Sequence, residues 1–276
     1  MPFPYAARRA EDAFPRSAWE RVKQSRYLLL LLASLASPAW PDDEPEATPY
    51  RPTVSNPAQL STPGYFEMEL GWERIQGGSD NRRKTGLPAL LKYAFTEDIG
   101  IMVGSTLHND QTGYDGYRVT GAGDTSLVLK QKWDMSETTA LGLELSAMVP
   151  SAKPGIGDGK TNYTANGIYS MDIAGNAIDI NVGLTSLGAI SPGESRYLWA
   201  WQAAIDHPLT ERWGVALEFS GTARDEAHPT TQILVSSSYQ VHRRVVLDAG
   251  MSRGMTHASQ DWSAFAGITV LVGKAW

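Results

Sequence analysis

The 276-residue chain has no cysteine, five histidines and no long apolar run. Without cysteine it can form neither a disulfide nor a thiolate metal site, and so few histidines disfavour a multi-histidine centre. We therefore expect no metal site and no cofactor. The missing apolar run argues against membrane-spanning helices. Charged residues make up 20% of the chain, below the usual quarter, which argues against disorder.

The longest apolar stretch is Tyr27–Ala36, which is too short to span a bilayer but typical of the central region of a signal peptide. Basic residues precede it, and small residues that suit cleavage follow at Ser37–Ala39, with Ser34–Ala36 as a second choice. We expect residues 1–39 to be a signal peptide rather than a buried core helix. Translation then starts at Met1 or, from a GTG codon, at Val22.

Residues 40–63 contain six prolines, a density that excludes helix and sheet interiors. This pattern predicts an extended periplasmic tail, which either hangs free or enters a cavity. After residue 39 the chain carries 18 basic and 27 acidic residues, and this acidity argues against nucleic acid as a partner.

From Tyr65 onward, apolar and polar residues alternate in twelve runs, the signature of half-buried strands. Long loops rich in Gly, Asp, Asn and Ser alternate with short turns along the chain. A soluble β-sandwich has no reason to sort its loops by length, whereas an outer-membrane barrel does so. The sequence therefore predicts an all-β fold, a transmembrane antiparallel up-and-down β-barrel of about twelve strands over residues 64–276. Both termini are expected on the periplasmic, short-turn side in the outer membrane of a Gram-negative bacterium.

Aromatic residues gather at the ends of the apolar faces, where amphipathic rings meet lipid headgroups. Any one of them alone is better explained as packing, but the sorting of the whole set favours two membrane girdles. The periplasmic girdle is expected to comprise Tyr93, Trp133, Trp213, Tyr239 and Trp276, and the outer girdle Trp72, Tyr197, Trp199 and Trp262.

The polar face of each strand is expected to line the barrel interior. The candidates are Glu67, Glu69, Lys92, Lys130, Lys132, Glu144, Asp172, Asp179, Gln202, Glu218, Gln232 and Asp248. Twelve strands lie between the filled eight-stranded barrels and the open sixteen-stranded ones, so we expect a narrow lumen. Either the charges line a pathway for small solutes, with a weak preference for cations or neutral molecules, or they pair with one another and hold the strands together.

Several short motifs resemble the outer-membrane transporters grouped with the meta-pathway phenol-degradation proteins. They are Arg51–Asn56, Pro63–Glu67, Glu69–Gly71 and Gly121–Asp124 ahead of Leu127 and Lys130. Tyr50 departs from the pattern, in which an Asp often precedes the Arg-Pro pair. The resemblance implies a barrel that passes small, often aromatic or hydrophobic, compounds. The carboxyl-terminal Trp276 also resembles the terminal signal of outer-membrane proteins, although Lys274 departs from it, and this implies the barrel-assembly machinery as a partner beside lipid and solute.

Two other functions remain open from the residues alone. Loop residues that a protease-like or lipase-like barrel enzyme would need are present as His108, Asp110, Asp115, His228 and His257, but nothing aligns them with a nucleophile, so we expect no enzyme. A structural or adhesive barrel without transport is the other alternative.

Overall fold

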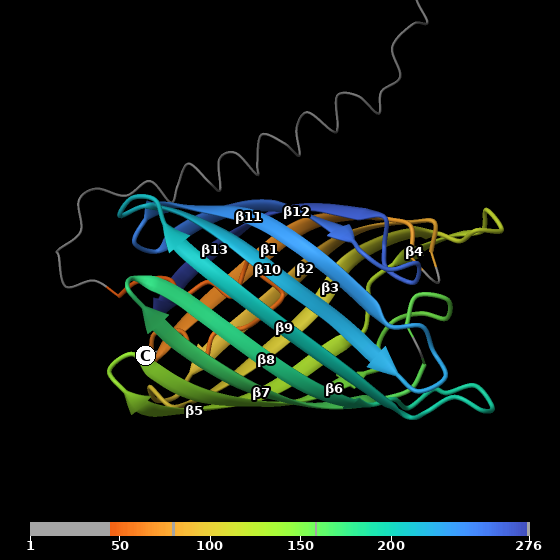
Figure 1. Cartoon of the computed structure of the whole chain (residues 1–276), viewed down its shortest axis with the longest axis horizontal. Coiled ribbons are helices and arrows are strands. Elements are labelled where there is room, and N and C mark those ends of the chain that lie inside the picture. Colours follow the sequence, from red (N-terminus) through yellow and green to blue (C-terminus); the bar gives the residue numbers. More distant parts are fainter. Residues whose placement is uncertain (1–44, 79–80, 158, 275–276) are drawn as a thin grey trace, which may run out of the picture. The chain divides into compact units, whose positions relative to one another are not determined.

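The computed structural model describes residues 45–78, 81–157 and 159–274, so the expected signal peptide, the start at Val22 and the girdle residue Trp276 lie outside the described residues. The described chain is built from strands (Figure 1). They are β1 (Tyr65–Gln76), β2 (Arg83–Ala94), β3 (Ile99–Thr112), β4 (Arg118–Gly121), β5 (Thr125–Ser136), β6 (Thr139–Val149), β7 (Asn162–Ile173), β8 (Asn176–Ser186), β9 (Tyr197–Pro208), β10 (Trp213–Arg224), β11 (Thr230–His242), β12 (Val245–Gly254) and β13 (Trp262–Lys274). Within this part of the chain, no helix is long and apolar enough to cross a membrane.

Each strand pairs antiparallel with its neighbours, and the sheet closes on itself through the pairing of β1 with β13. The short strand β4 pairs only with the end of β3, from Asn109 to Thr112, and β5 pairs with the rest of β3. Together β4 and β5 thus form one strand that is interrupted at residues 122–124. The prediction of a closed antiparallel barrel of twelve strands is confirmed.

Burial alternates along the strands because successive side chains point to opposite faces. Outward positions carry large apolar side chains such as Leu127, Leu129 and Leu145, each nearly half exposed. Inward positions are mostly small or polar, and the one cluster of buried apolar side chains among the described residues is formed by Ala58, Ala140 and Ile168. The barrel is thus apolar outside and polar inside, as membrane barrels require.

The connections are sorted by length between the two ends of the barrel, as expected (Figure 1). One end, here called the long-loop end, carries loops such as 150–161 and 187–196; the other, the short-turn end, carries turns such as 137–138 and 174–175. The turn at Ala174 and Gly175 has positive φ at both residues (54° and 77°), the conformation that matches the twist of a tight hairpin. Residues 109–121 form the hairpin of β3 and β4.

Candidate functional site

The Pro-rich residues 45–63, called the plug from here on, lie inside the barrel. Tyr50, Ser55, Ala58 and Ser61 are all buried. Their polar partners come from strands around the whole wall, including β1, β6, β10 and β12. Of the two arrangements that the sequence left open for this tail, the described part enters a cavity rather than hanging free, because the wall offers acceptors to its unpaired backbone N–H groups.

Three glutamates of the wall accept hydrogen bonds from the plug backbone. Glu67 accepts from the Thr48 N–H at 2.8 Å and Glu69 from the Tyr50 N–H at 2.7 Å. Glu218, on β10, four strands from β1 around the closed wall, accepts from Val54 and Ser55 at 2.7 and 2.9 Å. Charge-assisted bonds of this kind are short and strong, and they hold the plug without adding it to the sheet.

Arg51 anchors the middle of the plug to β12. Its guanidinium donates to both carboxylate oxygens of Asp248, at 3.1 Å from Nε and 3.0 Å from Nη2. Two inward glycines, Gly71 and Gly267, leave the space that the guanidinium fills, since a Cβ built at either would lie within 2.7 Å of it. The Phe265 ring lies 5.6 Å from the same group. The Arg51 guanidinium is thus held by the Asp248 carboxylate, by the space left at Gly71 and Gly267, and by the Phe265 ring.

Two lysines of the wall complete the charged contacts. Lys92 Nζ lies 2.5 Å from Glu67 and 2.6 Å from Glu69, and Lys130 Nζ lies 3.0 Å from Glu144. Both ammonium groups also lie over the Tyr50 ring, at 3.9 and 4.1 Å from its centroid. Each lysine further donates to a plug carbonyl, at Thr48 and Pro57. The charges of the wall therefore pair with one another and, at the same time, bind the plug.

The second half of the plug is held by amide and hydroxyl groups. Asn56 donates from its backbone to Asn181 Oδ1 at 2.8 Å and from its side chain to Glu144. The Ala58 N–H donates to Ser170 Oγ at 2.7 Å, and Ser170 in turn donates to Asp179. The plug is thus bonded to the wall from Thr48 to Ala58.

The predicted lumen residues fall into three groups. Eight are buried inside the barrel: Glu67, Glu69, Lys92, Lys130, Glu144, Asp179, Glu218 and Asp248. Gln202 and Gln232 are half-buried toward the long-loop end. Lys132 pairs with Asp134 at 2.8 Å, and Asp172 is exposed at the short-turn end, where it accepts from the Gly175 N–H of the turn.

Sequence reasoning did not identify the plug residues that bind the wall, nor two of the strand residues that bind the plug. They are Tyr50, Arg51, Asn56, Ser170 and Asn181. One signal was available, because the inward-facing acids outnumber the bases and an enclosed carboxylate needs a donor. Arg51 was noted only as part of a motif.

The plug lies between two cavities in the barrel interior. A cavity of about 320 Å³ at the long-loop end is lined by Val54 of the plug together with residues of β9 to β11 and the loop around Gln260. A cavity of about 240 Å³ at the short-turn end is lined by Pro57 and Gln59 of the plug and by the ends of β5 to β8. The plug therefore borders both cavities, through Val54 on one side and through Pro57 and Gln59 on the other.

The expected girdle residues face outward at both ends of the strands. Trp72, Tyr197 and Trp199 at the long-loop end, and Trp133, Trp213 and Tyr239 at the short-turn end, expose about half of their surface, while Trp262 is half-buried. Tyr93 differs, because its ring is buried against Phe66 and Phe95 at 4.9 and 5.1 Å between centroids. It therefore offers little of its ring to a membrane.

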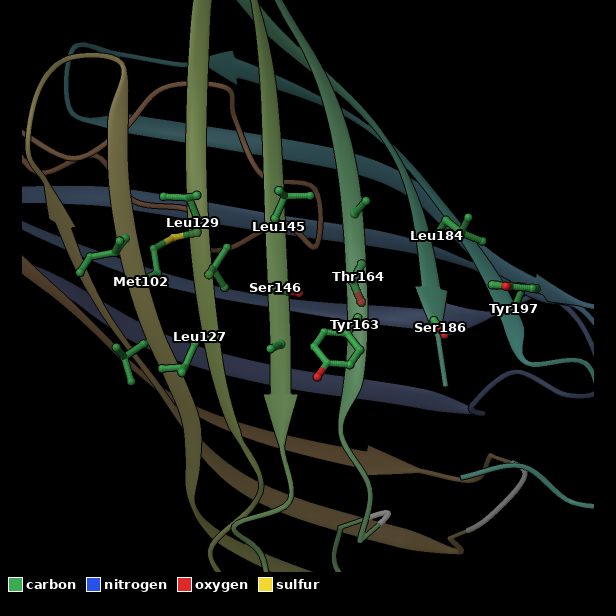
Figure 2. Close-up of a pocket in the computed structure, with 15 residues that line it drawn as sticks. Met102, Leu127, Leu129, Leu145, Ser146, Tyr163, Thr164, Leu184, Ser186 and Tyr197 are labelled. Carbon is green, nitrogen blue, oxygen red and sulfur yellow. The ribbon is translucent and has the colours of Figure 1, made fainter. Parts of the chain in front are cut away.

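A third concavity, of about 670 Å³, lies on the outward face rather than in the interior (Figure 2). Leu127, Leu129 and Leu145 border it on one side and Leu184 and Tyr197 on the other (Figure 2), and the small residues Ala147 and Ala165 leave the depression between them. It has an almost wholly apolar lining, as expected for a surface in contact with lipid chains. None of its lining residues is among the plug partners described above.

Of the residues considered for catalysis, His108 and Asp110 lie in β3 rather than in a loop, and no contact among the described residues joins the five into a catalytic site. Asp110 is bound by Arg118, and the Arg118 guanidinium that donates to it lowers the pKa of the Asp110 carboxyl. Across the described residues, no group of three or more His, Asp or Glu side chains could hold a metal ion.

Comparison with known proteins agrees with this architecture. A family model described as "Putative MetA-pathway of phenol degradation" matches residues 90–272, more than half of the chain. This match confirms the resemblance seen in the sequence motifs. No curated protein matches the chain.

Several solved structures share the fold. The COG4313 outer membrane channel from Pseudomonas putida F1 is 12% identical, with a TM-score of 0.62 over 85% of this chain and 100% of that chain. The NanC porin is 8% identical, with a TM-score of 0.53 over 75% of this chain and 100% of its own. The CymD monoaromatic hydrocarbon channel is 8% identical, with a TM-score of 0.50 over 78% of this chain and 90% of its own. At such identities the likeness establishes the fold.

Proposed function

The chain belongs to this phenol-degradation family, and we propose that it is an outer-membrane channel that passes small solutes when the plug moves. The observation that carries the proposal is the way in which the plug is held. Its hydrogen bonds go mainly to side chains of the wall, with one backbone bond from the Ala47 N–H to the Arg243 carbonyl in a turn, while the barrel closes through its own strand ladders. Water can replace each of these side-chain bonds, so the plug can leave without opening the sheet.

The proposed solutes are small and include aromatic or hydrophobic compounds. Support comes from the matched family and from the CymD structure, which is a monoaromatic hydrocarbon channel of the same fold. The lumen would be narrow and polar, with cavities on both sides of the plug. Transport through such a lumen needs no reaction at the loop histidines, so we propose no enzymatic activity.

The proposed setting is the outer membrane, with the long loops outside and both termini in the periplasm. The apolar outward face would meet lipid, and β13 would be read by the barrel-assembly machinery. The plug would then enter the barrel from the periplasmic side. In this orientation the long-loop cavity opens toward the outside.

The plug can be locked to test this function, because the chain has no native cysteine. A Cβ built at Gly142 lies 3.4 Å from the Cβ of Ala58, close to the spacing of a disulfide. We expect the double variant Ala58→Cys/Gly142→Cys to carry little current in planar bilayers when oxidised and more when reduced. Uptake of phenols, fatty acids and small ions by liposomes should change in parallel, and the two single variants serve as redox controls.

Two results would contradict the proposal. If neither the native chain nor the reduced double variant passes ions or solutes, the barrel is not a channel and a structural role gains support. If oxidised and reduced forms conduct equally, the plug is not the gate.

A further inference from the structure

Two arginines lie on the outward face of the barrel, at the long-loop ends of β1 and β2. Residues two positions apart in a strand share a face, so Arg74 lies on the same outward face as the exposed Trp72. Gln76, two positions further along β1, faces outward as well, and its cross-strand partner on β2 is Arg83. Directly opposed residues share a face of the sheet, so Arg83 also lies on the outward face.

A third arginine, Arg253 of β12, completes the same row. It pairs with Trp262 of β13, and Trp262 pairs with Gln76 on its other side. The strands β12, β13, β1 and β2 are consecutive in the sheet. Arg74, Arg83 and Arg253, called the arginine patch from here on, therefore extend across three strand spacings, about 14 Å.

The arginine patch lacks an acidic partner within the part of the chain that the structure describes. None of its three guanidinium groups forms an ion pair or a hydrogen bond there. The charge of Arg83 acts on Asp110 of β3, but that carboxylate is bound by Arg118. In a chain whose acids outnumber its bases, these guanidinium groups are left to bind an anion from outside the chain.

The other side of the long-loop end is uncharged at the corresponding positions. The last outward residues of β6 to β11 there are Val149, Tyr163, Ser186, Tyr197, Ala223 and Thr231. A general attraction to lipid headgroups would place basic side chains around the whole rim. Their restriction to β12, β1 and β2 indicates a local binding site.

The depth of the arginine patch is that of lipid headgroups. Trp262 lies in the same row, and Trp72 lies one outward position nearer the middle of the barrel, where aromatic rings meet the membrane interface. Further toward the middle, the outward positions beside them are apolar, at Leu70 of β1 and at Ala264 and Ala266 of β13. A lipid there can place its acyl chains on these strands and its headgroup on the arginines.

We propose that the arginine patch binds an outer-leaflet glycolipid that carries two phosphates and several acyl chains. The patch extends across four strands, so two separated phosphates match it better than a single phosphate. The inference goes beyond the channel function but rests on the proposed orientation, because only then do the long loops lie at the outer leaflet.

Binding can be measured by native mass spectrometry, which counts the lipids retained by the purified full chain. The probes are lipid A (an acylated glucosamine disaccharide with two phosphates), the same lipid without its phosphates, and phosphatidylglycerol. We expect one lipid A to be retained about tenfold more tightly than either of the others. Inorganic phosphate at the concentration of the lipid should not displace it, because it lacks acyl chains.

Replacing the arginines tests the site itself. The triple variant Arg74→Gln/Arg83→Gln/Arg253→Gln should weaken lipid A binding about a hundredfold, and each single change about fivefold. The corresponding triple change to Lys keeps the charge and should retain most of the binding. Lys160→Gln removes an exposed positive charge at the uncharged side of the same end and should leave binding unaltered.

The three arginines have no partner to lose among the described residues, so the unfolding midpoint of the triple Gln variant in urea should match that of the native chain. Unaltered lipid A binding in this variant would overturn the inference. Equal binding of the dephosphorylated lipid or of phosphatidylglycerol by the native chain would overturn it too, whatever the stability of the variants.

The same measurements separate this inference from the channel function, because lipid binding needs no movement of the plug. Lipid A binding by a chain that passes no solute in the redox-locked experiment would contradict the channel function alone. Solute passage by a chain that retains no lipid A would contradict the lipid site alone.

Discussion

Beside the plug, the wall presents six buried carboxylates and two buried lysines, whereas around the long-loop cavity it presents amides and hydroxyls with one paired lysine. In the first region each of these groups contacts another charge or the plug itself, except Asp179, which accepts a hydrogen bond from Ser170. In the second region Gln202 keeps an acceptor without a partner. The comparison indicates that the buried charges hold the plug, whereas the neutral groups of the second region bond mostly with one another.

The physical reason lies in the cost of burying charge. A buried ion pair gains little net stability, yet it costs several kcal/mol when one partner is removed. Such groups therefore fix one arrangement of the plug strongly. Neutral groups cost less to desolvate, so the wall around the long-loop cavity constrains its contents less.

The largest expected effect is a difference in the stability lost when one lysine is replaced in each region. Lys92→Met leaves Glu67 and Glu69 buried without a cation and should destabilise the protein by about 3–5 kcal/mol. Lys84→Met, the same change beside the neutral cavity, breaks a partly exposed pair and should cost about 0–1 kcal/mol. Urea unfolding from lipid vesicles measures both. Equal losses would show that the two regions do not differ as described.

An intermediate effect is expected on ion selectivity when the plug is absent. Deleting residues 45–63 removes Arg51 and exposes a wall with more buried carboxylates than lysines, so the open lumen should prefer cations. Reversal potentials across a KCl gradient measure this preference. Glu218→Gln in the deleted chain should reduce it, and Gln202→Leu should not. A preference for anions would contradict the assignment of the charged wall.

The smallest effect concerns the β3–β4 hairpin, which lies outside both interior regions. The hydrogen bond from Arg118 lowers the pKa of Asp110, so the pair contributes fully above the ordinary aspartate pKa of about 4 and is lost as pH falls through the lowered value. Protease cleavage within residues 113–117 should increase over that acidic range. Asp110→Asn should abolish the pH dependence without altering solute passage. A hairpin whose cleavage does not respond to acid would contradict this role.

Much of the wall could be predicted from local pattern. The period of two placed Glu67, Lys92 and Glu144 on the inward faces, and the sorted loops indicated a closed barrel. The interruption between β4 and β5 was not predicted, because it depends on distant contacts: Gly123 donates to the Thr106 carbonyl at 2.8 Å, and Asp124 accepts from Ala152. No local pattern marks such contacts.

The plug was predicted as an extended segment but could not be placed. Several of its partners lie far away in sequence, and Arg51 and Asp248 are 197 positions apart. Most of the donors are backbone N–H groups, which every residue except proline carries, so residue identity does not reveal them. The long-loop cavity likewise joins strands that are distant in the chain.

The sequence by itself determined the barrel, its strand faces and its polar interior. Alternation along a strand is a local property, because lipid on the outside favours apolar side chains and the enclosed interior favours polar ones. Only the tertiary structure decided what that interior contains. Closing the sheet brings the carboxylates of β1, β6, β10 and β12 around one axis, where they bind the plug. The same closure leaves a neutral cavity beside the plug. The charged and the neutral regions of the interior thus depend on which side chains the closed wall brings together.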